Sequence, residues 1–315
     1  MKRSPLVASA LALALVAPAS AAAASAKPAV TTGAAADVAI QTATLTGSVD
    51  PNGAATTYFF QIGTTSVYGV QTPTASAGAG NSRVAVTAPL TGLAPATRYH
   101  YRLVARNRNG LVKGGDRTFK TKPQPLGVTL AATPNPVPFG SPVTLAGQLT
   151  GTGNANRQVV LQSNPFPYTQ GFQNASNVQV TDAAGNFSFP LLSVPLSTQY
   201  RVQMPQRPEV VSPIVSLGVA VRLTTHVSSH RVTRGARVRF SGSIRPASDG
   251  ARVLFQRKKR HRWVQVSHTF ARGSGKSSRY SKRVRISRGG TYRVFVQVAG
   301  AFVSNEGTHM HVRTR

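Results

Sequence analysis

The stretch Leu90-Thr-Gly-Leu-Ala-Pro-Ala-Thr-Arg-Tyr-His-Tyr-Arg-Leu-Val-Ala105 places a turn, a proline and a tyrosine directly before an alternating strand. This order is typical of a tyrosine corner, in which a buried Tyr directs its hydroxyl to the backbone a few residues upstream and fixes a loop. Tyr99 is the candidate for this structural role. Tyr101, Leu103 and Ala105 follow at period two, so one face of the strand is predicted to be apolar.

Further strands flank this motif. The run Ala43-Thr-Leu-Thr-Gly-Ser-Val-Asp-Pro-Asn-Gly53 predicts a strand and a turn, Thr57-Tyr-Phe-Phe-Gln-Ile-Gly63 a second strand, and Gly115-Asp-Arg-Thr-Phe-Lys-Thr121 the last one. Together with the corner motif they cover about residues 29 to 122. This segment resembles a fibronectin type III domain, in particular the repeats of secreted bacterial proteins. The resemblance implies an immunoglobulin-like antiparallel β-sandwich.

Residues 1–26 are predicted to form a secretory signal peptide. Met1-Lys-Arg3 is basic, residues 6–17 are apolar, and small residues follow at Ala19-Ser-Ala21 and Ala24-Ser-Ala26, which are the three regions of such a peptide. The apolar run is shorter than the roughly 20 residues needed to span a bilayer, so no membrane span is expected after cleavage. Cleavage after Ala21 and after Ala26 both fit the pattern. The chain contains no cysteine, so each domain must be stabilised by its own core.

An internal repeat follows the linker Lys122-Pro-Gln-Pro125. The paired segments are 140–147 with 235–242, 160–162 with 254–256, and Tyr200-Arg-Val-Gln203 with Tyr292-Arg-Val-Phe295. The offset between them falls from about 95 to about 92 residues, a length that indicates a domain duplication.

Both copies alternate apolar with polar or basic residues and carry regular turn signals, which is typical of antiparallel sandwiches. Tyr292, Val294, Val296 and Val298, for example, share one face of a predicted strand. The predicted fold class is all-β, with three tandem immunoglobulin-like antiparallel β-sandwiches after the signal peptide. Their predicted ranges are 27–122, 123–217 and 218–315.

Positive charge is concentrated in the third predicted domain. The whole chain carries a formal net charge of +30, from 37 basic and 7 acidic residues. Residues 27–122 carry +7, residues 123–217 carry +1, and residues 218–315 carry +20 from 22 basic and 2 acidic residues. Because the middle copy is almost neutral, a general compositional bias does not account for the whole excess.

The densest basic run lies between two strand-like segments and predicts a hairpin with a basic tip. Its candidate polyanion-binding residues are Arg257, Lys258, Lys259, Arg260 and Arg262. Two interpretations stay open: contact with a polyanion, and a solvated surface that resists aggregation. Trp263, the single Trp of the chain, is expected in the core of its sandwich, and stacking on a ligand is the alternative.

Catalytic and metal sites are not indicated. The seven acidic residues stand apart from one another, mostly at turns: Asp37, Asp50, Asp116, Asp182, Glu209, Asp249 and Glu306. Glycoside hydrolysis needs two carboxylates that face one bond, and the common hydrolase, zinc and phosphate-loop motifs are missing. The pairs His226 with His230 and His309 with His311 are expected to be exposed polar residues, since no Cys or acidic ligand accompanies them. We therefore expect no enzyme, no small-molecule substrate, no cofactor and no metal.

These observations predict a non-catalytic, exported modular protein of the bacterial cell envelope or its surroundings. The first two domains would be spacers or protein-contact modules, and the basic third domain would anchor the chain to anionic envelope polymers such as teichoic acids. Other surface proteins are further expected partners. The alternative is a soluble secreted polyanion-binding protein, whose ligand is an envelope glycan, a teichoic acid or, without sequence specificity, nucleic acid.

Overall fold

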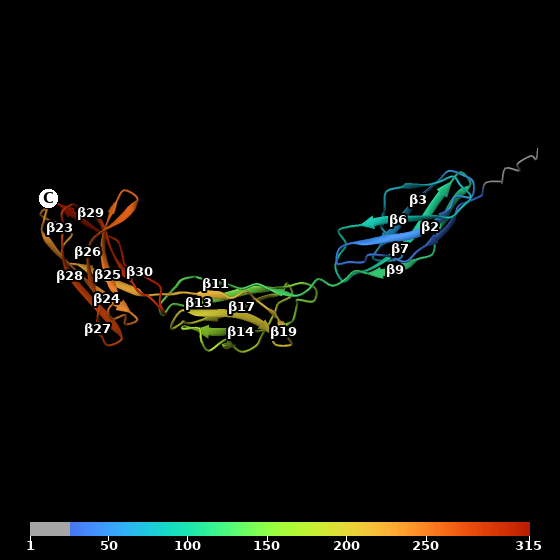
Figure 1. Ribbon diagram of the computed structural model, residues 1–315. Helices are drawn as coiled ribbons and strands as arrows, with labels where there is room; N and C mark the ends of the chain where they lie inside the picture. The colour runs from blue at the N-terminus through green and yellow to red at the C-terminus, as the bar shows by residue number, and fades with distance from the viewer. Residues whose placement is uncertain (1–25) are drawn as a thin grey trace, which may run out of the picture. The chain divides into compact units, whose positions relative to one another are not determined.

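The computed structural model describes residues 26–315, which form β-sheets and contain no helix (Figure 1). The predicted all-β fold is confirmed. The predicted signal peptide lies outside the described residues, except for Ala26. The chain divides into two compact units whose boundary lies between Gln124 and Pro125. The first unit holds one sandwich and the second holds two, and the proposed division near residue 217 stays a prediction.

The first sandwich comprises a sheet of three strands and a sheet of six strands, of which two are long. The first sheet has the order β1 (Ala29–Thr32), β2 (Ala43–Asp50), β6 (Val84–Leu90). The second sheet is built around β3 (Thr56–Gly63) and β7 (Arg98–Asn107), with β4 (Val70–Gln71) and β5 (Ala75–Gly78) beside β3, and β8 (Gly110–Lys113) and β9 (Arg117–Lys120) beside β7.

The second sandwich repeats this plan. Its first sheet holds β10 (Gly127–Val128), β11 (Ala131–Thr133), β13 (Val143–Thr150) and β17 (Asn186–Leu191). Its second sheet holds β14 (Gln158–Pro165), β15 (Gln173–Asn174), β16 (Gln179–Val180), β18 (Thr198–Met204), β19 (Arg207–Val211) and β20 (Val215–Leu217). The short strands β12 (Val137–Pro138) and β21 (Val219–Ala220) pair in parallel.

The third sandwich has the same central strands with a longer hairpin. Its first sheet has the order β22 (Arg222–Val227), β24 (Arg237–Arg245), β28 (Ser277–Arg285), β27 (Arg272–Ser274). Its second sheet holds β23 (Arg231–Val232), β31 (Met310–Thr314), β29 (Gly290–Gln297), β25 (Arg252–Lys259) and β26 (Arg262–Phe270), with β30 (Asn305–Glu306) beside β29.

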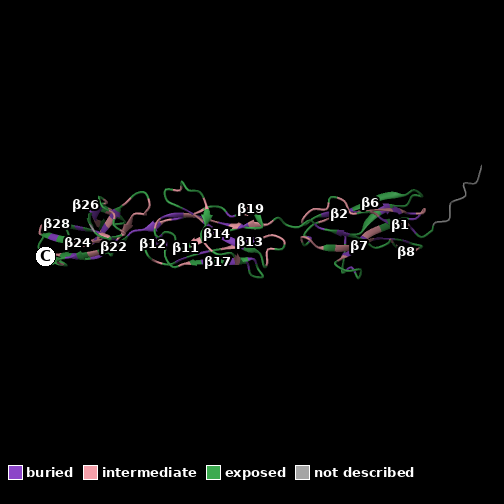
Figure 2. Ribbon diagram, turned by 90° about the horizontal axis from the view of Figure 1, so that it is seen from below, coloured by how far each residue is buried: buried purple, intermediate pink, exposed green. Residues whose placement is uncertain are grey.

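All three sandwiches therefore share one topology. In each, one pair of long strands forms the centre of the first sheet (β2 with β6, β13 with β17, β24 with β28), and a second pair forms the centre of the other sheet (β3 with β7, β14 with β18, β25 with β29). This order is that of fibronectin type III-like and immunoglobulin-like sandwiches. Figure 2 shows buried residues interspersed with intermediate and exposed ones along these strands, as expected when one side of each sheet faces the core.

A glycine on the second long strand allows close approach of an aromatic ring and of the first strand. A Cβ at Gly147 would lie 2.0 Å from the Thr129 carbonyl oxygen and 2.8 Å from the Phe187 ring. At Gly242 a Cβ would lie 1.9 Å from the Thr224 carbonyl oxygen and 2.6 Å from the Tyr280 hydroxyl. A side chain at either position would collide with backbone, so the repeated glycine is required by packing.

Tyr280 is buried beneath this glycine. Its exposed fraction is 3%, and its hydroxyl lies 2.9 Å from the Thr224 carbonyl oxygen and 2.9 Å from the Thr225 hydroxyl. Burial, opposed by the hydrogen bond with Thr225, raises the pKa of Tyr280 from 10.0 to about 12. The protonated phenol thus contributes stability that is present in full below pH 10 and is lost as the pH rises through about 12.

We expect the third sandwich to lose roughly 3 kcal/mol of unfolding free energy across this pH range because of Tyr280 alone. The measurement is urea unfolding at several pH values between neutrality and strong alkali, monitored by the fluorescence of Trp263, the single Trp of the chain, which lies in the third sandwich. Tyr280→Phe is the matched control, since it retains the ring and removes the titrating group. Identical pH dependence in the two proteins would contradict the prediction.

Phe302 connects the cores of the two sandwiches in the second unit. It is half-buried, packs against both hydrophobic clusters, and meets Phe139 edge-to-face with ring centroids 6.3 Å apart. The backbone beside it bonds to the strand between the sandwiches, where the Val303 N–H donates to the Val219 carbonyl at 2.8 Å. Val219 belongs to the middle core and Val221 to the third, so the chain passes from one core to the other between these residues.

Phe302→Ala is expected to destabilise both sandwiches, by about 2 kcal/mol in total, because a half-buried ring is lost from two cores. Hydrogen exchange of β13 and β24 reports each sandwich separately. Val298→Ala is the control, since Val298 packs against the third core, and it should accelerate exchange in β24 alone. Acceleration confined to one sandwich in Phe302→Ala would show that the shared contact has no energetic weight.

Candidate functional site

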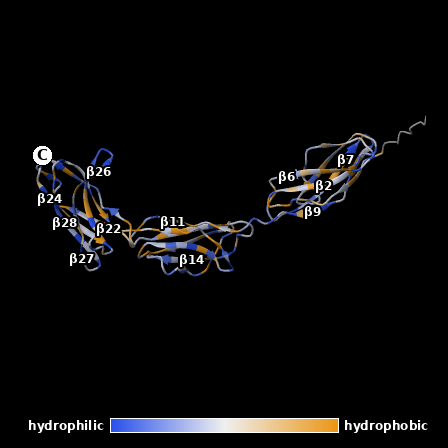
Figure 3. Ribbon diagram, viewed as in Figure 1, coloured by the Kyte–Doolittle hydropathy of each residue, from blue (hydrophilic) through white to orange (hydrophobic). Residues whose placement is uncertain are grey.

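The basic run forms the end of the β25–β26 hairpin. Lys259 pairs with Arg262, so the turn consists of Arg260 and His261. Arg260 has φ 55°, a left-handed conformation of the kind that two-residue hairpin turns require. Lys258, Lys259, Arg260 and Arg262 are exposed, whereas Arg257 is half-buried. Figure 3 shows the hairpin end near the β26 label as hydrophilic.

The predicted basic tip is therefore shorter than expected. Four of the five candidate residues lie on paired strands, and only Arg260 belongs to the turn. Arg257 lies opposite Tyr292 on β29, and its charge lowers the pKa of Tyr292, although burial as the larger effect raises that pKa overall. The structure thus gathers the five side chains into one stretch of the hairpin and presents four of them to solvent.

Trp263 is not a member of the core, and the expectation for it was wrong. It lies opposite Lys258, on the side of the sheet that faces away from the core residues Val253 and Phe255. Its half-buried ring is covered by the Arg293 guanidinium at 4.3 Å from the centroid and by the His309 ring at 4.9 Å between centroids. The two-residue turn determines this, because it fixes which residue of β25 faces Trp263.

The four histidines are exposed as expected, but an acidic residue does accompany one of them. Glu306 accompanies His309, with 3.1 Å between its carboxylate and the His309 Nε2, and pairs with the Arg293 guanidinium. His230 Nδ1 instead lies 3.0 Å from the His311 carbonyl oxygen. Across residues 26–315, no group of three or more His, Asp or Glu side chains is placed to hold a metal ion.

The cluster around Arg293 has counterparts in the other two sandwiches. A glutamine carboxamide accepts a hydrogen bond from an arginine Nε on the paired strand, at 2.8 Å for Gln61 with Arg102, 2.8 Å for Gln162 with Arg201 and 2.7 Å for Gln256 with Arg293. Each arginine also lies over a ring, Tyr68, Phe172 or Trp263, at 4.4, 4.3 and 4.3 Å from the centroid. In every case a buried tyrosine directly precedes the arginine.

Sequence reasoning found this repeat in two copies and missed the first. The signal was present, since Phe59-Phe-Gln61 and Tyr101-Arg-Leu103 align with the segments that identified the other copies. Tyr101, Tyr200 and Tyr292 are the equivalent residues, and all three rings are buried. The cation–π contact and the charge-assisted hydrogen bond stabilise the outer surface of each sheet.

The Tyr99 hydroxyl accepts a hydrogen bond from the Ala94 N–H at 2.9 Å, five residues upstream. The ring is half-buried rather than buried, and it stacks on Phe119 with centroids 5.5 Å apart. Tyr292 makes a similar contact that sequence reasoning missed, because its hydroxyl donates to the Arg288 carbonyl at 2.6 Å. Both contacts join a strand to the loop that precedes it.

Tyr292→Phe is expected to cost roughly 1–3 kcal/mol of unfolding free energy, since it leaves a partly buried carbonyl without its donor. Tyr99→Phe should cost about 1 kcal/mol, because the Ala94 amide is exposed and water can replace the lost partner. Urea midpoints of the two units measure these effects, and each variant serves as a control for the other unit. An unchanged midpoint for Tyr292→Phe would contradict the assignment.

A second basic surface lies on the β22–β24–β28 sheet. Seven exposed arginines, here called the arginine face, project from these strands: Arg222, Arg237, Arg239, Arg245, Arg279, Arg283 and Arg285. Six of them form directly opposed pairs in the strand register, Arg237 with Arg285, Arg239 with Arg283 and Arg222 with Arg245. Basic residues alternate with apolar or hydroxyl residues along β24 and β28, which is the sequence signal for this surface, and the strand register brings the arginines together.

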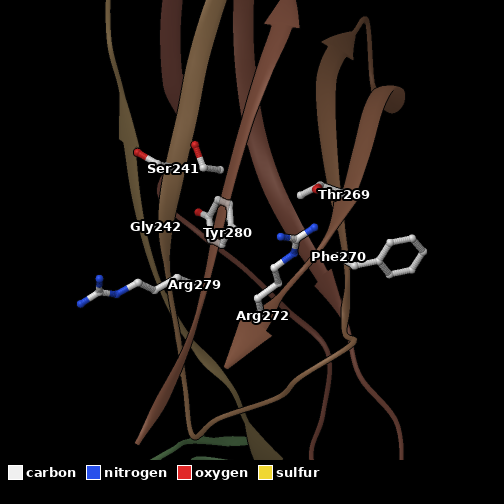
Figure 4. A pocket seen from close by; sticks show the side chains of 8 residues that line it. Ser241, Gly242, Thr269, Phe270, Arg272, Arg279 and Tyr280 are labelled. Carbon is white, nitrogen blue, oxygen red and sulfur yellow. The ribbon is translucent and has the colours of Figure 1, made fainter. Parts of the chain in front are cut away.

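A hollow of about 620 Å³ opens beside this sheet, between β24, β28 and the end of β26. It is lined by Ser241, Gly242, Thr269, Phe270, Arg272, Arg279, Tyr280 and Ser281. Figure 4 shows Arg279 and Phe270 pointing to opposite sides. None of the lining residues is a carboxylate or a histidine, so this hollow holds no pair for general acid–base catalysis.

Among residues 26–315, no helix is long and apolar enough to cross a membrane.

Comparison with solved structures finds several tandem-domain proteins. The FN1–FN3 domains of chicken CNTN1 match with 14% identity and a TM-score of 0.29, over 91% of this chain and 100% of theirs. Domains of titin match with 15% identity and a TM-score of 0.38, over 92% of this chain and 100% of theirs. A tetra-tandem repeat in the extending region of a large adhesion protein matches with 17% identity and a TM-score of 0.27, over 91% and 74%. No family model and no curated protein matches the sequence.

Proposed function

We propose that this chain is a non-catalytic modular protein exported to the bacterial envelope, where its third sandwich attaches it to anionic polymers. The observation that carries the proposal is a contrast between two sandwiches of the same topology. Residues 218–315 carry 22 basic residues, whereas residues 123–217 carry 3. A requirement of the fold would apply to both sandwiches, so the excess is specific to the third.

The charges of the third sandwich are largely free of internal neutralisation. Within residues 218–315, the ion pairs are those of Glu306 with Arg293 and His309. The other carboxylate, Asp249, is hydrogen-bonded by the Ser278 hydroxyl. The exposed hairpin residues Lys258, Lys259 and Arg262 therefore face solvent with no carboxylate partner, a state that attracts polyanions.

The first two sandwiches serve as spacers or protein-contact modules in this proposal. Each of them has a hydrophobic core of its own, and the middle sandwich is almost neutral. Proline-containing linkers such as Lys122-Pro-Gln-Pro125 favour an extended, fairly stiff connection. Such modules separate an attachment site from whatever the other end of the chain contacts.

The test is binding of the chain from residue 27 to isolated bacterial cell walls, before and after teichoic acid has been removed. Binding should fall steeply with salt, as expected for release of counterions; on double-stranded DNA the slope is about 0.9 per neutralised phosphate. Arg257, Lys258, Lys259, Arg260 and Arg262 are replaced together by Ser in one variant. The slope of log affinity against log salt concentration should then become smaller by several units, because several phosphate contacts are lost, while the fold is retained.

The control replaces Arg157 and Arg207, the exposed basic residues of the middle sandwich outside the glutamine–arginine cluster, by Ser and should leave wall binding unchanged. Absence of wild-type binding to any polyanion at low salt would overturn the proposal and leave a solvated surface as the explanation. Release into the medium with bound extracellular DNA, and no retention on walls, would favour the soluble polyanion-binding alternative.

A further inference from the structure

The arginine face places like charges directly opposite one another. Cross-strand pairs have Cα atoms about 4.5–5.5 Å apart, and like charges in this position destabilise a sheet. Three such pairs occur on β22, β24 and β28. The remaining outward residues of these strands are neutral hydroxyl or imidazole side chains, namely Thr224, His226, Ser241, Ser243 and Ser281. The face thus carries repulsion that an external anion would relieve.

We propose that the arginine face binds the backbone of a polymer made of phosphodiester-linked polyol or sugar units, with one phosphate between the guanidinium groups of Arg237 and Arg285 and the next between those of Arg239 and Arg283. This inference rests on the proposed function and deepens it, because it names the contact surface and the chemistry of the ligand. The hairpin then contributes general attraction, while the sheet provides the specific contacts.

The choice of arginine supports a phosphate ligand. Every charged residue on this face is an arginine, whereas the exposed hairpin also carries Lys258 and Lys259. A guanidinium presents a planar fork of donors that matches the two free oxygens of a phosphodiester, and an ammonium acts only as a point charge. Two opposed guanidiniums can therefore hold one phosphate from both sides.

The spacing supports a repeating ligand. Arg237 and Arg239 on β24, opposite Arg285 and Arg283 on β28, form two successive rows. Rows two residues apart on a strand are separated by about 6.6–6.8 Å. This separation is comparable with the repeat of an extended phosphodiester backbone, so neighbouring rows can contact successive phosphates.

The residues between the charged rows favour polyol or sugar units over nucleobases. Ser241 lies opposite Ser281, and Thr224 lies opposite Ser243 with their hydroxyl oxygens 2.8 Å apart. These groups can exchange hydrogen bonds with ligand hydroxyls. Proteins that bind single-stranded nucleic acid stack bases on aromatic side chains, and the outward residues of β22, β24 and β28 include no Phe, Tyr or Trp.

The middle sandwich offers a natural control within the same fold. Its corresponding face pairs Thr144 with Pro190, Ala146 with Ser188 and Gln148 with Asn186. These strands hold the same glycine and aromatic packing as β24 and β28 but no charge. The arginines are therefore additions to a sheet that folds without them.

The experiment uses the chain from residue 27 and two probes, poly(glycerol phosphate) and oligothymidylate with the same number of phosphates. A face variant replaces Arg237, Arg239, Arg283 and Arg285 by Ser, and a second variant replaces the same four by Lys. A hairpin variant replaces Lys258, Lys259, Arg260 and Arg262 by Ser and removes the same charge.

Thermal unfolding at low salt shows whether each variant folds. The face Ser variant should unfold at a higher temperature than wild type, because the repulsion between the opposed arginines is removed.

We expect the face Ser variant to lose affinity for poly(glycerol phosphate) roughly tenfold or more, and more than the hairpin variant loses. The Lys variant, which keeps the charge, should lose affinity several-fold, and wild type should prefer poly(glycerol phosphate) to oligothymidylate. Wild-type affinity in the Lys variant, or equal binding of both probes, would overturn the ligand chemistry. A face Ser variant that binds like wild type would overturn the site while the proposed function stands; a wild type that binds neither probe nor cell walls would overturn both.

Discussion

Each sandwich depends on one constraint: a strand that alternates a buried tyrosine with an outward arginine. Tyr101, Tyr200 and Tyr292 fill the cores, and the arginine that follows each of them is held by a glutamine and an aromatic ring on the outer surface. Because side chains of a strand alternate between faces, a shift of one residue would bring an arginine into the core. The Tyr-Arg pair therefore fixes the register between the two central strands of the second sheet, in a chain that has no disulfide to do so.

Much of this architecture follows from sequence patterns. Alternation, turn residues and the internal repeat predict the strands and the all-β fold, because burial of one face imposes period two. The position of Trp263 does not follow in this way, because it depends on the length of the hairpin turn. The turn consists of Arg260 and His261, and it lacks the glycine or asparagine by which a two-residue turn is recognised in a sequence. The first copy of the repeat is harder to recognise, because two tyrosines, Tyr99 and Tyr101, fit the period-two pattern of its strand, and only Tyr101 is equivalent to Tyr200 and Tyr292.

The candidate site was predictable in its charge but not in its geometry. A basic run is visible along the chain, whereas opposed arginines arise only when β24 and β28 pair in one register. Sequence spacing between Arg239 and Arg283 contains no hint of that pairing. The middle sandwich forms the same strand pairing with a neutral face, so the opposed arginines are not required by the fold.

The opposed arginines make salt act in two directions on the same sandwich. Dissolved ions screen the repulsion between guanidinium groups, so the unfolding free energy of the third sandwich should increase as the ionic strength rises. The same ions compete for the arginines and weaken any hold on a polyanion. Raising the ionic strength should therefore stabilise the third sandwich against unfolding and at the same time lower the affinity that we propose for a polyanion, while at low ionic strength a bound polyanion would itself reduce the repulsion.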